Sequence, residues 1–85
     1  EHSVDFNTFV FSLGSSAFIH LGEAPNPESD KVEVDLVMAK QSIDILGMLQ
    51  EKTRGNLNDE EARFLEGLLY DLRMKFLAQQ QKQAQ

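Results

Sequence analysis

The chain contains no cysteine and no tryptophan, and its 85 residues include only two prolines and one tyrosine. Without cysteine, disulfide scaffolds and thiolate chemistry are excluded, and the redox compartment stays open. Positive charge is also scarce, because eight Lys and Arg residues stand against fourteen Asp and Glu, for a formal net charge of −6. An acidic surface repels the phosphates of nucleic acids and of anionic membranes. We therefore expect neither a nucleic acid nor a membrane as a partner.

Long apolar runs are missing too, so no segment reaches the roughly 20 apolar residues that would span a bilayer. Nothing in the sequence points outside the cell, and the cytoplasm is the expected location. The first residue is Glu1 rather than Met, so it stays open whether native N-terminal residues are missing. An apolar content of 41% is that of a folded chain. We expect a single domain over residues 4–78, followed by a polar Gln-rich tail over 79–85.

Charge is absent altogether from residues 6–22, although 26% of the whole chain is charged. Asp5 is a good N-cap and Gly22 a good C-cap, so the spacing predicts a helix over residues 6–21. Its expected core arc is Phe6, Phe9, Val10, Leu13, Ala17 and Leu21. The opposite side is uncharged and small, with Ser12, Ser15 and Ser16, which would let another backbone approach closely.

Two further helices follow a loop that carries both prolines. Asp35 can cap a helix over about 36–54, which Gly55 ends. Asn58 and Glu61 form a capping-box pattern before the strongest apolar periodicity in the chain, which predicts a helix over about 59–78. The fold class is thus all-α, a three-helix unit made of a helical hairpin and an N-terminal helix.

The order of these pieces is similar to that of a known family. "DFNTFVFSLGSSAFIHLGEAPNP", then "VDLVMAKQSIDILGMLQEKTRGNL", then "DEEARFLEGLLYDLRMKF" resembles DUF1844, a small bacterial domain of unknown function. The resemblance runs from about Val4 to Phe76. It implies an all-helical, cytoplasmic, bacterial protein, and it supplies no catalytic residues.

Catalytic, cofactor and metal sites are not expected. His20 is the one histidine inside the patterned region, and metal sites need further His, Asp or Glu ligands at suitable spacing. We treat His20 as a structural histidine, with a ligand contact as the alternative. The acidic residues at 59–61 suit a helix N-terminus, which explains them without acid–base chemistry. Ser15 and Ser16 lack a nucleophile elbow.

An uncharged first helix needs more cover than two other helices of one small chain provide. The sequence therefore predicts a homo-oligomeric helical bundle, with the first helix at a subunit interface. The interface candidates are Phe11, Gly14, Ser15, Phe18, Val37, Met48, Tyr70, Met74 and Leu77. The expected function is a non-catalytic interaction or scaffold module whose partner is itself, with another protein as a further option. The alternatives are a small-molecule-binding or regulatory protein with a pocket near His20, and a non-catalytic subunit of a larger enzyme.

Overall fold

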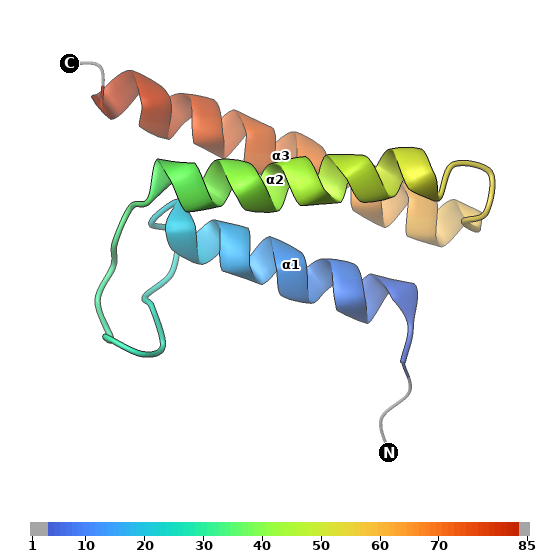
Figure 1. Ribbon diagram of the computed structural model, residues 1–85, viewed down its shortest axis with the longest axis horizontal. Coiled ribbons are helices and arrows are strands. Elements are labelled where there is room, and N and C mark those ends of the chain that lie inside the picture. Colours follow the sequence, from blue (N-terminus) through green and yellow to red (C-terminus); the bar gives the residue numbers. More distant parts are fainter. Residues whose placement is uncertain (1–3, 84–85) are drawn as a thin grey trace.

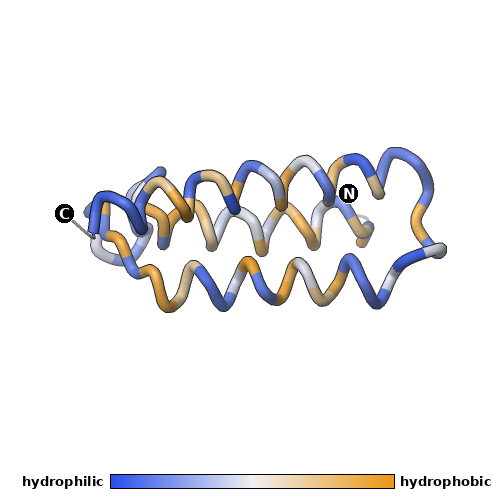
Figure 2. Tube along the Cα trace, turned by 90° about the horizontal axis from the view of Figure 1, so that it is seen from above, coloured by the Kyte–Doolittle hydropathy of each residue, from blue (hydrophilic) through white to orange (hydrophobic). Residues whose placement is uncertain are grey.

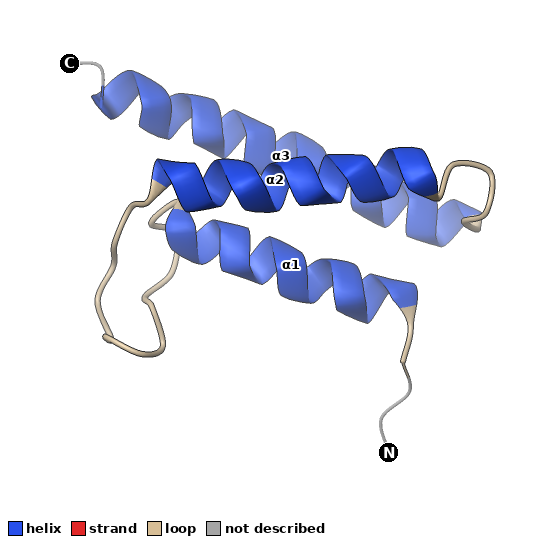
Figure 3. Cartoon of the chain, viewed as in Figure 1, coloured by secondary structure: helices blue, strands red, loops and turns tan. Residues whose placement is uncertain are grey.

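The computed structural model of the chain describes residues 4–83, which form the helices α1 (Phe6–His20), α2 (Leu36–Lys52) and α3 (Asp59–Gln83). Successive helices run antiparallel, so α1 and α3 point the same way (Figure 1). Residues 4–83 contain no strand beyond one isolated antiparallel bridge between Leu21 and Val34 (Figure 3). The predicted all-α unit of three helices is confirmed.

The first two helices begin where the sequence predicted, because an aspartate caps each of them. Asp5 accepts a hydrogen bond of 2.7 Å from the backbone N–H of Thr8. Asp35 accepts one of 3.1 Å from the backbone N–H of Met38. Each bond satisfies a backbone donor that has no partner within its helix. The C-terminal ends of α1 and α2 lie one and two residues before the expected positions.

The start of α3 is a reciprocal capping box. The backbone N–H of Glu61 donates to Asn58 Oδ1 over 2.8 Å, and the backbone N–H of Asn58 donates to Glu61 Oε1 over 3.0 Å. Two otherwise free donors are satisfied by this exchange. The carboxylates of the first turn also complement the positive end of the helix dipole.

The end of α1 is a Schellman turn that sends the chain into a long loop. Gly22 has a φ of 78°, a left-handed conformation that glycine adopts without strain. Its N–H donates to the carbonyl of Ile19, and the N–H of Glu23 donates to the carbonyl of Phe18. The loop returns to the same helix end, where the N–H of Asp35 donates to the carbonyl of His20 over 2.8 Å. This return sets α2 beside α1.

The hydrophobic core lies between the three helices and is small. The Cα positions span 41 × 30 × 16 Å, so the molecule is thin and few side chains are far from solvent. All three helices contribute to the core, and hydrophobic segments recur along each of them (Figure 2). Its buried hydrophobic residues are Val10, Ala17, Leu21, Ala39, Ile43, Leu46, Leu65, Leu69 and Leu72.

The predicted core arc of the first helix is found in the core at every position except Phe9. Val10, Gly14 and Ala17 are its buried residues, whereas Phe9, which the periodicity placed in the core, is 50% exposed. A Cβ added at Gly14 would lie 2.7 Å from Leu68 Cδ2 of α3. The missing side chain of Gly14 therefore lets α3 of the same chain approach α1.

The third helix runs to Gln83, five residues beyond the expected end at residue 78. Gln79 holds this last part in place, because its Nε2 donates to the backbone carbonyl of Leu21 over 3.0 Å. The Nζ of Lys75 also lies 3.9 Å from Glu23 Oε1. Residues 79–83 are thus part of the helix rather than a separate tail, and residues 84–85 of the predicted tail lie outside the described residues.

Candidate interaction surface

The described part of the chain has more exposed large hydrophobic residues than buried hydrophobic residues. Nine hydrophobic residues are buried, and twelve large hydrophobic residues are more than a third exposed within residues 4–83. Nine of the twelve lie on helices, where packing against a partner helix is the usual role of an apolar face. They are Phe9, Phe11, Val37, Met38, Ile45, Met48, Tyr70, Met74 and Leu77.

One group of these residues forms a line along the outer side of α3. We call Gly67, Tyr70, Met74 and Leu77 the α3 stripe. Their spacing of three, four and three residues puts them on one face of the helix. Tyr70 is 67% exposed, and Met74 and Leu77 are each about half exposed. The core residues of α3 lie on the opposite face, and of the α3 stripe only Leu77 also borders α2, where it lines a hollow with Ile43.

A second group lies on α1 and α2. Phe11 is 60% exposed and Val37 is 74% exposed, and Met48 is about half exposed. Val37 and Met48 are eleven residues apart, close to three helical turns, so they share the outer side of α2. These residues were predicted as interface candidates, and the structure leaves them accessible for contact with another molecule.

Two of the predicted interface residues on α1, Gly14 and Phe18, pack within the chain itself. Gly14 is buried against Leu68 of α3, so the prediction that it lies at a subunit interface is wrong. Phe18 is half-buried and packs against the core, and Ser15 is half-buried. The sequence could not show this, because a helical wheel identifies a small face without saying which helix approaches it.

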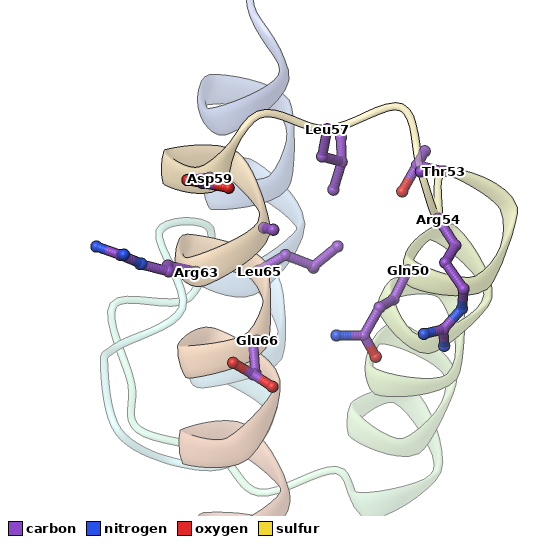
Figure 4. A pocket seen from close by; sticks show the side chains of 10 residues that line it. Gln50, Thr53, Arg54, Leu57, Asp59, Arg63, Leu65 and Glu66 are labelled. Carbon is purple, nitrogen blue, oxygen red and sulfur yellow. The ribbon is translucent and has the colours of Figure 1, made fainter.

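One hollow lies between the C-terminal end of α2 and the N-terminal end of α3. Its volume is about 380 Å³ and its lining includes Gln50, Arg54, Arg63 and Glu66 (Figure 4). Arg54 is occupied by Glu51, whose Oε2 lies 2.6 Å from the guanidinium. The side chain of Arg63 points away from α2 in Figure 4. The charged groups therefore do not converge on one point, as a binding site for a charged ligand requires.

The hollow beside His20 is smaller and lies on the loop side of α1. It measures about 270 Å³, and Asn26, Glu33 and Asp35 are among its lining residues. No cluster of three or more His, Cys, Asp or Glu residues that could hold a metal ion is found among the described residues. A role of His20 in ligand binding stays a prediction.

Among the acidic groups, Asp5 has an altered ionisation with a structural cause. The backbone N–H of Thr8 donates to its carboxylate, and the Thr8 hydroxyl adds a second hydrogen bond, so the pKa of Asp5 lies below its usual value. These bonds favour the charged form of the carboxyl group. Asp5 is an exposed helix cap, and this shift belongs to capping rather than to acid–base chemistry.

The fold and the surface together define an all-α three-helix protein with apolar side chains on the outer sides of its helices. The chain belongs to the family DUF1844, a domain of unknown function, whose model matches residues 3–78. No curated protein and no solved structure matches the chain. No helix in the described part of the chain is both long enough and apolar enough to cross a membrane.

Proposed function

We propose that this chain is a non-catalytic helical interaction module that assembles with copies of itself. The observation that carries the proposal concerns the described residues. Nine hydrophobic residues are buried in the core, whereas twelve large hydrophobic residues are exposed. Burying a large apolar side chain fully is worth about 1.5–3 kcal/mol relative to leaving it exposed. Association covers such side chains on both copies at once, and it is therefore a strong source of stability for so small a core.

The non-catalytic part of the proposal is supported by the structural roles of the chemically active groups. Glu61 completes the capping box of α3, and Asp59 and Glu60 lie in the same first turn. Ser12 donates its hydroxyl to the carbonyl of Phe9 within α1. Each of these groups is explained by the helix in which it lies. If the partner is another protein instead of a second copy, the chain could serve as a non-catalytic subunit of a larger enzyme.

A small-molecule-binding or regulatory role is the second candidate, and the hollow beside His20 is the observation that favours it. Two carboxylates, Glu33 and Asp35, line this hollow together with His20. Under this alternative His20→Ala abolishes ligand-induced stabilisation and leaves assembly unchanged. The cytoplasmic location and the bacterial origin that the family resemblance implies remain predictions.

Thermal unfolding over a wide concentration range tests the proposal. A protein that unfolds from an assembled state melts at higher temperature as its concentration rises, because mass action favours the oligomer. We expect the midpoint to rise by several degrees between about 5 and about 500 µM. The matched variants are Phe11→Glu and Met74→Glu, each on an exposed face, with Glu28→Gln in the loop as control. A midpoint independent of concentration contradicts the proposal.

A further inference from the structure

Gly67 is a residue that the fold of a single chain does not explain. It lies in the middle of α3, and a Cβ added there would meet nothing within 4 Å. Glycine is the least favourable helix-interior residue after proline, so an open position would normally carry a better helix former. Gly67 is also the one small residue of the α3 stripe, between the exposed side chains of Arg63 and Tyr70. This combination marks a place where another chain can approach the backbone.

Two opposite charges flank the α3 stripe on the side that faces α2. Arg73 lines the shallow hollow between α2 and α3 together with Ile43, Phe76 and Leu77, and its guanidinium reaches the position of Gly47 in α2. Glu66 lines the hollow at the other end of the same helix pair, together with Gln50 of α2. Glu66 and Arg73 are seven residues apart, two helical turns, so they lie on the same flank. The midpoint between them falls between Leu69 and Tyr70.

We propose that the α3 stripe binds the α3 stripe of a second copy, antiparallel, about a two-fold axis that passes beside Tyr70. The proposal deepens the function proposed above and rests on it. Residues at equal distance from Tyr70 in opposite directions then lie opposite each other. Met74, four residues after Tyr70, lies within one residue of the position opposite Gly67 of the second copy, so its long side chain packs over that glycine. The two Tyr70 rings meet at the axis.

The charges fit the same register. A two-fold axis keeps the α2-facing flanks of both α3 helices on one side of the pair. Glu66 of each copy, four residues before Tyr70, therefore meets Arg73 of the other copy, three residues after it. Two reciprocal ion pairs form, and Leu77 packs along the aliphatic stem of Arg63 of the other copy. A parallel two-fold pair would instead put the α2-facing flanks on opposite sides of the pair, so Glu66 of one copy would not meet Arg73 of the other.

This reciprocity is the reason why the occupant is a second copy rather than a different protein. A face that carries opposite charges at nearly equal distances on either side of one point is self-complementary, as an isologous two-fold interface requires. The charged residues named on this face are Arg63, Glu66 and Arg73, so the face is not acidic, although the whole chain carries a net charge of −6. The contact therefore avoids the repulsion that other pairs of surfaces on two such acidic chains would meet.

The size of the face sets the expected strength of binding. From Arg63 to Gln81 the helix rises by about 27 Å, and a helix is about 10 Å wide. The contact of α3 alone is thus well below the roughly 800 Å² per partner of a standard interface. We expect association in the micromolar range, with the hollow between α2 and α3 adding contact at its edge.

Charge reversal tests the register. Glu66→Arg and Arg73→Glu each create two like-charge contacts, and each should weaken association by about tenfold. Mixing the two variants, or combining both changes in one chain, pairs opposite charges again and should restore association. Glu28→Arg, with the same change of charge on the loop, is the control and should have no such effect. Two single variants that associate as the wild type does, or a mixture that stays weak, overturn the antiparallel register.

Cysteine cross-linking tests the position of the axis, since the chain has no cysteine of its own. Tyr70→Cys places one thiol of each copy beside the axis, and mild oxidation should give a covalent dimer. Leu77→Cys lies on the same stripe, but the two copies of this residue are about 21 Å apart along the antiparallel helices. We expect rapid cross-linking for Tyr70→Cys and little for Leu77→Cys. The reverse order overturns the proposal.

The outcomes separate this pairing from the broader proposal. Suppose that the wild-type protein associates and that every α3 variant assembles to the same mass as the wild type. The α3 pairing is then wrong, and assembly uses the exposed residues of α1 and α2, namely Phe11, Val37 and Met48. If the wild-type protein stays monomeric at every concentration tested, both the pairing and the proposed self-assembly are wrong. Circular dichroism of each variant at low concentration verifies that the helices remain formed.

Discussion

Three glycines lie inside helices of this chain, and two of them, Gly14 and Gly67, have opposite surroundings. Gly14 of α1 is buried, and a Cβ there would collide with Leu68, whereas a Cβ at Gly67 of α3 would meet nothing within 4 Å. Glycine costs about 0.8–1.0 kcal/mol relative to alanine inside a helix. At Gly14 the close packing of two helices offsets that cost within one chain. At Gly67 no neighbour in the chain does so, which is why we assign this face to assembly.

The largest expected effect comes from filling the buried glycine. Gly14→Leu forces a side chain against Leu68, and we expect it to lower the free energy of unfolding by about 1–3 kcal/mol or more. Urea denaturation at low concentration measures the loss. Gly67→Leu is the matched control, because the same side chain enters open space there and should change the monomer by less than about 0.5 kcal/mol or stabilise it. Equal losses at both positions would contradict the contrast between the two glycines.

Removing the cap of α3 should have the next largest effect. Asn58→Ala deletes the acceptor for the backbone N–H of Glu61, and we expect a loss of about 0.5–2 kcal/mol in the free energy of unfolding. Asn56→Ala, two residues earlier in the exposed turn, is the control. This pair shows whether α3 owes its stability to its capped start, independently of its outer face. A variant at Asn58 as stable as the control would show that the capping box contributes nothing.

A smaller change at the open glycine should act on folding and assembly in opposite directions. Gly67→Ala improves helix propensity and should stabilise the monomer by up to about 1 kcal/mol. The same methyl group occupies the space that Met74 of a second copy needs, so association should weaken. Urea denaturation at low concentration and sedimentation at high concentration measure the two effects separately. If association instead becomes tighter, Gly67 is not a contact point.

The smallest expected effect concerns the exposed cap of α1 and depends on pH. The folded state lowers the pKa of Asp5, so its contribution is present above the unfolded pKa of about 3.9 and is lost as the pH falls through the folded value. Asp5→Asn keeps a capping oxygen and removes the titration. We therefore expect wild type and variant to differ most near neutral pH and to converge in acid. A difference that grows below pH 4 would contradict this assignment.

The local features of the fold could be predicted from the sequence. The caps at Asp5, Asp35 and Asn58 were predicted because each one joins residues only three positions apart. The same holds for Gly22, whose left-handed conformation ends α1. Signals of this kind need no knowledge of which helix packs against which.

Features that depend on distant contacts could not be predicted in this way. The end of α3 is fixed by Gln79, which donates to the carbonyl of Leu21, 58 positions earlier in the chain. The close approach of α3 to α1 at Gly14 depends on Leu68 of α3, and hydropathy favoured Phe9 for the core although it is 50% exposed. The exposure of Tyr70, Met74 and Leu77 of the α3 stripe could be predicted from the helical periodicity, because these residues belong to one helix.

Sedimentation equilibrium of the wild-type protein between about 5 and about 500 µM tests directly whether a second copy covers the apolar helix faces. We expect the mass to rise from 9.6 kDa toward twice this value as the concentration increases. We further expect that Gly67→Leu, at the same concentrations, shifts this curve to higher concentration without loss of helix content. A mass that remains at 9.6 kDa throughout the range would contradict the proposed self-assembly.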